Sequence, residues 1–167
     1  MAREKTMAQA HDADERPLDD AHVREMLDYE RFREDALVKV RHTICECLNV
    51  EEEEVADDSS FYAELGAESI DSLDLTFRLE LDFRVKIPRG EMMLQVDMFD
   101  PFTDFHNGTL TPAALGKFIE QYPYLADAVQ SIEQPTPANL MDLLTPKAIV
   151  NYFTIRRREI REAGAQP

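Results

Sequence analysis

Two serines lie three residues apart among carboxylates in the stretch LGAESIDSLDL, residues 65–75. Ser69 follows Glu68, and Ser72 follows Asp71. No base stands beside either hydroxyl, the four histidines are scattered without metal-ligand spacing, and no P-loop, GxGxxG, GxSxG or HExxH motif occurs. We therefore assign no catalytic residue and no metal ligand. A serine in this setting either caps a helix or serves as a site on which another protein acts.

The overall composition narrows the classes of partner. The formal charge of −16 over 167 residues repels nucleic acid and favours basic protein surfaces. No apolar run approaches the ~20 residues of a membrane span, and the N-terminus lacks the apolar core of a secretory signal, so we expect a cytoplasmic protein. Cys45 and Cys47 fall on different faces of a predicted helix, which argues against a disulfide or a metal pair.

Helical periodicity and capping residues predict the elements that position the serines. Residues 1–17 read as a disordered tail. A helix follows over residues 17–34, either separate from the next one or continuous with it, and the next ends at Asn49. Further helices are expected over Ser69–Phe83, from Thr111-Pro112 to about Tyr122, and from Thr145 to about residue 157.

The predicted helix at Ser69–Phe83 has two apolar faces. One face carries Leu75, Leu79 and Phe83, and the other carries Ile70, Leu73 and Phe77. A surface helix of a small domain needs only one apolar face. The second face therefore lies against another layer of the protein or contacts a partner.

From Val40 to Pro88 the chain resembles an acyl carrier protein, a member of the phosphopantetheine-binding carriers. CLNVEEEEV is similar to the end of that family's first helix and the start of its long loop, SFYAELGAESIDSLDL resembles its modification motif, and LELDFRVKIP resembles the end of its second helix. Peptidyl carriers usually show Gly-Gly and a non-acidic residue before the serine, so Ala67 and Glu68 favour the acyl branch.

The resemblance implies an all-α fold: a four-helix acyl-carrier-like bundle, here with an inserted segment and an extra N-terminal helix. It implies that Ser69 carries a covalent 4′-phosphopantetheine arm, taken from coenzyme A by a phosphopantetheinyl transferase. The arm's thiol would hold an acyl chain as a thioester for dedicated lipid or polyketide biosynthesis enzymes. Ser72 stands where the family has a small or apolar residue without this role. We expect the carrier to act as a monomer.

The partner-binding face expected from this resemblance combines an acidic rim with an apolar centre, which suits enzymes with basic surfaces. Its residues are Glu68, Ile70, Asp71, Leu73, Asp74 and Phe77. A helix N-terminus at Ser69 would also present amide groups and positive dipole character to the arm's phosphate.

The chain is longer than a minimal member of this family. We expect a carrier-like domain over residues 18–160, an insertion over about 91–139, a final bundle helix over about 145–157 and a disordered tail over 161–167. The final helix could instead begin at Thr111, although Gly116 weakens that helix. The insertion is rich in Met and Phe, which should pack on the bundle, line an acyl-chain tunnel or bind a partner. These residues are Met92, Met93, Met98, Phe99, Phe102 and Phe105.

Three alternatives stay open beside the acyl carrier. One is an interaction protein that keeps the carrier fold and stays unmodified, and another is a peptidyl or aminoacyl carrier. The third is a small enzyme that uses Glu68 and Asp71 as a general acid/base pair. Nothing in the sequence indicates burial that would raise the pKa of either carboxyl, which argues against the enzyme.

Overall fold

The computed structural model describes residues 20–164, and it is mostly helical. The chain divides into two compact units, Met1–Phe32 and Arg33–Pro167. The described part of the first unit is the beginning of helix α1, and the residues predicted as an N-terminal tail lie outside the described range. The elements in chain order are α1 (Asp20–Leu48), the 3₁₀ turn η1 (Glu52–Glu54), α2 (Ser69–Phe83), β1 (Phe105–His106), β2 (Thr109–Leu110), α3 (Pro112–Gln121), the 3₁₀ turn η2 (Pro123–Leu125), α4 (Ala126–Gln130), α5 (Pro137–Met141) and α6 (Pro146–Gly164).

The predicted all-α fold is confirmed, since the sheet among the described residues is a single pair of two-residue strands. The helix predicted over residues 17–34 is continuous with the next, and together they form α1. Asn49 ends α1 as predicted: it adopts a left-handed conformation with φ of 54°, and the Val50 amide bonds back to the carbonyl of Cys45 at 3.2 Å. Among the described residues, no helix is both long and apolar enough to cross a membrane.

Helix α2 spans the predicted residues, and its exit is fixed by its own side chains. Arg84 follows in a left-handed conformation with φ of 54°. The Glu80 carboxylate then accepts hydrogen bonds from Lys86 Nζ at 2.9 Å and from the Ile87 amide at 2.8 Å. The bond from Lys86 is the main reason that the pKa of Glu80 lies below its usual value. Ile87 is thereby held in the core at the point where the chain leaves the helix.

Helix α6 packs its first half into the core of the second unit. Thr145 caps it by accepting a hydrogen bond from the Ala148 amide, and Ile149, Val150 and Phe153 are buried. The Phe153 ring stacks on Phe83 of α2 with centroids 3.8 Å apart. The helix continues to Gly164, whereas the sequence predicted an end near residue 157. The last turns of α6 are exposed, so their residues do not need an apolar periodicity from which the C-terminal end of the helix could be predicted.

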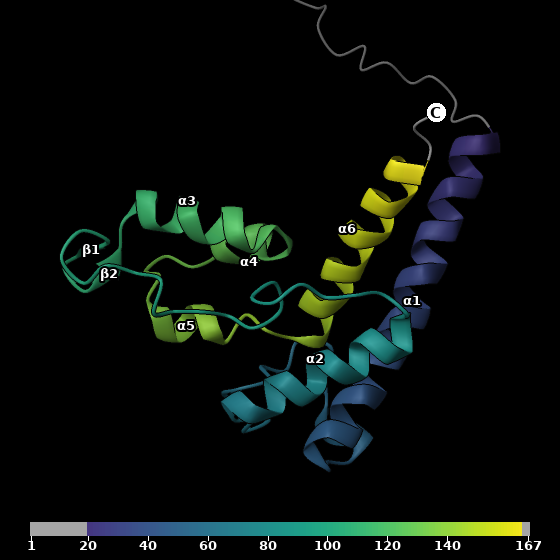
Figure 1. Ribbon diagram of the computed structural model, residues 1–167, viewed down its shortest axis with the longest axis horizontal. Helices are drawn as coiled ribbons and strands as arrows, with labels where there is room; N and C mark the ends of the chain where they lie inside the picture. Colours follow the sequence, from purple (N-terminus) through teal and green to yellow (C-terminus); the bar gives the residue numbers. More distant parts are fainter. Residues whose placement is uncertain (1–19, 165–167) are drawn as a thin grey trace, which may run out of the picture. The chain divides into compact units, whose positions relative to one another are not determined.

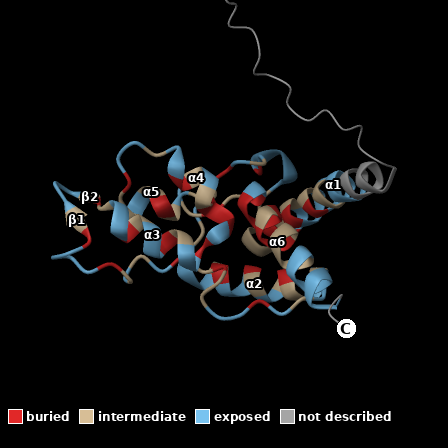
Figure 2. Ribbon diagram, turned by 90° about the horizontal axis from the view of Figure 1, so that it is seen from above, coloured by how far each residue is buried: buried red, intermediate tan, exposed pale blue. Residues whose placement is uncertain are grey.

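The long segment between α2 and α6, residues 84–145, is called the α2–α6 connection. It holds the β1–β2 hairpin, which turns at Asn107-Gly108, and the helices α3, α4 and α5. In Figures 1 and 2, α3, α4 and α5 lie between the β1–β2 hairpin and α6, and the hairpin is at the end farthest from α6. Thr111 caps α3 and Thr136 caps α5, each just before a proline at the first helical position.

A chain of aromatic contacts joins this connection to α6 and α2. Its successive pairs lie between 3.8 and 6.3 Å apart at their ring centroids, and they are Phe99–Phe118, Phe118–Tyr122, Tyr122–Tyr124, Tyr124–Tyr152, Tyr152–Phe153 and Phe153–Phe83. Such ring pairs add to the apolar burial that each side chain contributes. The connection is therefore built onto α6 through a shared core.

The Met and Phe residues of the predicted insertion mostly pack inside the protein. Met92 and Phe99 are buried, and Met93, Met98 and Phe105 are half-buried. Phe102 is the exception to the expected packing, because 92% of it is exposed. It stands on a turn whose backbone amides at Phe102 and Thr103 donate to the Asp100 carboxylate, so the local chain conformation turns the ring outward.

Candidate functional site

The loop before α2 is held firmly and delivers Ser69 to the helix start. The Phe61 side chain is fully buried, and its amide donates to the carbonyl of Leu144 at 2.9 Å. The loop closes on itself through the Ala67 amide, which donates to the carbonyl of Phe61 at 3.1 Å. Gly66 has a φ of 70°, and no atom lies within 4 Å of where its Cβ would be. Its requirement is therefore the left-handed backbone rather than space.

Ser69 is the first residue of α2, and its side chain is exposed. The N-cap is Glu68, with φ of −99° and ψ of 170°, so the alternative that Ser69 caps the helix is wrong. The Asp71 carboxylate accepts a hydrogen bond from the Glu68 amide at 2.7 Å and completes the cap. Within the part of the chain that the structure describes, the Ser69 hydroxyl makes no hydrogen bond. It is accessible to an external protein.

Ser72 is placed very differently. It is 2% exposed, and its hydroxyl donates to the backbone carbonyl of Ser69 at 2.7 Å. A modifying enzyme cannot reach this group without opening the helix. The two serines therefore differ in burial. The Ser69 hydroxyl faces solvent, whereas the Ser72 hydroxyl is buried and bonds to a backbone carbonyl.

The two apolar faces of α2 predicted from the sequence are present. Leu75 and Leu79 are fully buried, and Phe83 is half-buried under Phe153. The opposite face is exposed, and Leu81, which the sequence reasoning missed, extends it. Its exposed fractions are Ile70 64%, Leu73 52%, Phe77 58% and Leu81 62%. Its spacing of three and four residues continues past Phe77, and this signal could have identified Leu81.

The acidic residues at this site are partly engaged within the protein. Asp71 completes the helix cap, and Asp74 accepts a hydrogen bond from Arg78 Nε at 2.7 Å. Arg78 also lies 3.7 Å from Glu46 of α1. The side chains of Glu68 and Asp74 remain exposed. The rim is therefore acidic near Ser69 and becomes mixed in charge one turn farther along α2.

Cys47 links α1 to the start of α2 as a neutral thiol. Its Sγ donates to the carbonyl of Asp71 at 3.4 Å, and burial, with Asp74 adding to it, raises its pKa to about 11. Cys45 and Cys47 are both free thiols. A thiol with this pKa is a poor nucleophile at neutral pH, so its role here is packing.

A groove with a cavity volume of about 420 Å³ runs beside the exposed face of α2. On the helix it is bordered by Leu73 and Thr76, and on the other side by the first part of the α2–α6 connection. Leu73 comes one helical turn after Ser69, so the groove begins close to that serine. The connection contributes Ile87, Pro88, Arg89, Gly90, Met92, Met93 and Gln95.

Comparison with protein families finds one match, over part of the chain. Residues 38–96 match the family model described as phosphopantetheine attachment site. Over this segment the chain resembles a phosphopantetheine-binding carrier protein. The family carries a covalently attached 4′-phosphopantetheine. The match runs from the second half of α1, through α2, to the first residues of the α2–α6 connection. No match is found among solved structures.

The matched segment, residues 38–96, is called the carrier segment from here on. Carrier domains deliver a bound group to other enzymes and generally do no catalysis themselves. Such domains interact with transferases and synthases as a class. The rest of the α2–α6 connection and α6 lie outside the match, although Phe153 of α6 stacks on Phe83 at the end of α2.

Proposed function

We propose that the chain is an acyl carrier protein whose 4′-phosphopantetheine arm is attached to Ser69. The observation that carries the proposal is the exposed, unbonded hydroxyl of Ser69 at the first position of α2 inside the carrier segment. The amide groups and the dipole at the helix N-terminus favour the phosphate that would be joined there. The arm's thiol then holds an acyl group as a thioester.

The attachment reaction needs no base from this chain. The Ser69 oxygen forms a bond to the phosphorus nearest pantetheine in coenzyme A, and the bond to the bridging pyrophosphate oxygen breaks. Adenosine 3′,5′-bisphosphate leaves, and the serine proton passes to a base of the transferase. This chain contributes an accessible hydroxyl on a rigid turn, which Gly66 and the buried Phe61 position.

The exposed face of α2 is the proposed contact surface for the transferase and for acyl-transferring enzymes. Ile70, Leu73 and Phe77 offer apolar contacts, and Leu81 continues them. The exposed carboxylates at Glu68 and Asp74 would attract a basic partner surface toward Ser69. Lipid or polyketide synthesis is the proposed setting, because Ala67 and Glu68 follow the acyl branch of the family.

The deciding experiment is intact-mass analysis after incubation with coenzyme A and a phosphopantetheinyl transferase. We expect the full chain to gain the mass of one phosphopantetheine, the Ser69→Ala variant to gain nothing, and the Ser72→Ala variant to gain the same mass as the wild type. Ser72→Ala is the matched control, because it removes a hydroxyl three residues away that is buried in the helix. Modification that survives Ser69→Ala and disappears in Ser72→Ala would refute the assignment. An unchanged mass in the wild type would favour the unmodified interaction protein.

A further inference from the structure

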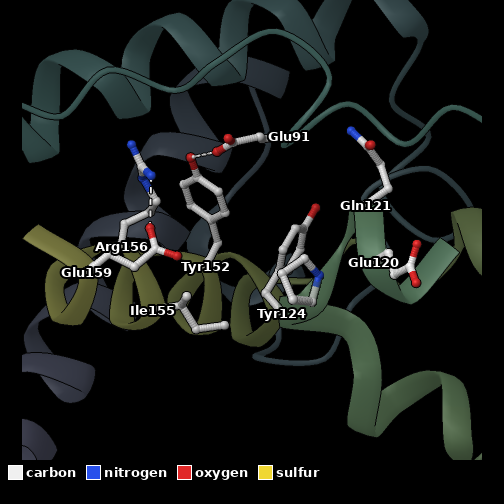
Figure 3. Close-up of a pocket in the computed structure, with 9 residues that line it drawn as sticks. Glu91, Glu120, Gln121, Tyr124, Tyr152, Ile155, Arg156 and Glu159 are labelled. Atoms are coloured by element: carbon white, nitrogen blue, oxygen red, sulfur yellow. Dashed lines mark hydrogen bonds and ion pairs between the residues drawn. The ribbon is translucent and has the colours of Figure 1, made fainter. Parts of the chain in front are cut away.

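The aromatic side chains of the α2–α6 connection are buried or half-buried, with one exception. Figure 3 shows Tyr124 of the connection beside Tyr152 of α6, and the Tyr152 hydroxyl there donates to Glu91 Oε2 at 2.7 Å. Phe102 is the exception, because 92% of it is exposed, the largest exposed fraction among the large apolar residues that the structure describes. A single exposed apolar side chain is ordinary on a protein surface, so the setting of Phe102 has to show whether it has a role.

Phe102 projects from a turn that is held on both sides by packed aromatic rings. This turn, residues 100–104, is called the Phe102 turn. Phe99 before it is buried and Phe105 after it is half-buried, and their rings meet edge to face with centroids 6.3 Å apart. Pro101 restricts the backbone immediately before Phe102. The turn leads directly into β1, whose hairpin lies at the end of the connection farthest from α6 (Figures 1 and 2).

Two carboxylates fix the backbone of the Phe102 turn. Asp100 Oδ1 accepts hydrogen bonds from the amides of Phe102 at 2.8 Å and Thr103 at 3.2 Å. Asp104 Oδ2 accepts from the Asp100 amide at 2.9 Å, and Asp104 Oδ1 binds Lys117 Nζ of α3 at 2.9 Å. Asp104 is only 3% exposed, so this network is tied to the interior of the protein. Because the turn is fixed in advance, a contact made through the Phe102 ring would cost little ordering of the backbone.

The charge around the Phe102 turn selects the kind of partner. Residues 90–146 contain eight Asp or Glu residues but only one Lys or Arg, which is Lys117. Lys117 is paired with the buried Asp104, whereas Asp97 and Asp100 are exposed beside Phe102 in the sequence. Such a surface repels nucleic acid, anionic lipid and a second copy of itself, and it attracts a basic protein surface.

We propose that the Phe102 turn is a second docking surface, formed by other residues than the exposed face of α2, and that its partner is a protein with an apolar pocket rimmed by Lys or Arg. The Phe102 ring fills the pocket, and Asp97 and Asp100 face the basic rim. Aromatic residues are enriched in the cores of protein interfaces, where a few anchors carry most of the binding energy. The surface does not include Ser69, so this proposal and the proposed function stand or fall separately.

The first step of the test identifies the partner by photo-crosslinking with the full chain in its native cells. The photoreactive residue p-benzoyl-L-phenylalanine replaces Phe102 in one sample and replaces Gln130, an exposed residue of α4, in the control. We expect another protein to be crosslinked from position 102 and not from position 130. The absence of such a product overturns the proposal. A product made of two copies of this chain also overturns it, in favour of self-association.

The second step titrates the identified protein, once purified, with the full chain by calorimetry, since capture alone does not show which residues bind. Phe102→Ala should weaken binding about tenfold or more. Val38→Ala is the matched control, because it shortens an apolar side chain that is 66% exposed on α1, and it should keep the wild-type affinity. Wild-type affinity in Phe102→Ala, or equal losses in the two variants, would overturn the proposal.

Two further measurements test the rigid turn and the basic rim. Phe102→Ala should melt within a few degrees of the wild type, and a large loss of melting temperature would mean that the ring packs within the protein rather than in a partner. Asp97→Asn removes an exposed carboxylate and should weaken binding at low salt, with a smaller difference at high salt. Wild-type affinity that does not fall as salt is added would exclude a partner with a basic rim.

Discussion

Helix α2 and the α2–α6 connection use their large apolar residues in opposite ways. Along α2, Ile70, Leu73, Phe77 and Leu81 are all more than half exposed. In the connection, Phe99, Phe118, Tyr122 and Tyr124 are buried and contact one another in sequence. The contrast shows that the protein can bury such residues, so the open face of α2 is consistent with a surface kept for partners.

The two regions nevertheless depend on the same scaffold helix. Phe153 of α6 stacks on Phe83 at the end of α2, and the adjacent Tyr152 contacts Tyr124 of the connection. The backbone joins them as well, because the Lys147 amide of α6 donates to Asp57 and the Phe61 amide donates to Leu144. We therefore propose that α6, rather than the helix beginning at Pro112, completes the carrier bundle.

The largest expected effect comes from removing α6. A chain ending at Pro137 should lose cooperative thermal unfolding and should not be modified, because Ile149, Val150 and Phe153 would leave the core. A chain ending at Arg157 is the control, since residues 158–164 are exposed, and it should unfold cooperatively and be modified. Circular dichroism and intact mass measure both properties. A shorter chain that folds and is modified would assign the bundle helix to α3.

Local signals in the sequence were sufficient for the elements of the site. The helical periodicity predicted α2 from Ser69 to Phe83, and the Thr-Pro pairs at Thr111 and Thr145 predicted the starts of α3 and α6. The same Thr-Pro signal precedes α5 at Thr136, where it was overlooked. The two faces of α2 were also predictable, because helical spacing fixes which side chains share a face.

Those local signals could not predict which residues far apart in the sequence pack together. The contact between Tyr124 and Tyr152 joins residues with no local relationship, and the unpaired state of the Tyr124 hydroxyl follows only from what surrounds it. Phe102 is the opposite case. The Met and Phe content of its segment favoured a packed side chain, but the turn at Asp100 leaves the ring exposed. The cap at Glu68 was missed because serine is the commoner N-cap residue.

Within the connection, the buried and exposed aromatic residues give the next largest difference. Phe118→Ala should lower the free energy of unfolding by ~3–5 kcal/mol, because the ring is fully buried against Phe99 and Tyr122. Phe102→Ala removes the same side chain from an exposed turn and should change stability by no more than about 0.5 kcal/mol. Urea denaturation measures both. Equal losses would mean that Phe102 packs in solution.

On α2 the matched pair is Leu79→Ala and Leu73→Ala. Leu79 is fully buried, so its truncation should destabilise the protein by roughly 2–5 kcal/mol. Leu73 is 52% exposed, so its truncation should leave stability nearly unchanged and slow modification by the transferase instead. Unfolding curves and initial rates of mass gain separate the two effects. If Leu73→Ala is modified at the wild-type rate, this residue does not belong to the partner face.

The smallest expected effect concerns the charge beside the attachment site. Asp74→Lys should slow association with a basic transferase a few-fold at low salt, and the difference should vanish at high salt, where the Debye length is only ~3 Å. Asp74 is the better test than Asp71, because the Asp71 carboxylate caps α2 and its loss would disturb the helix start. The new lysine faces Arg78 one turn away, so melting must be compared first. Asp127→Lys on α4 is the control, since it makes the same charge change on an exposed residue of the connection. A salt-independent loss at Asp74, or an equal loss at Asp127, would show that general charge rather than the rim beside Ser69 governs the encounter.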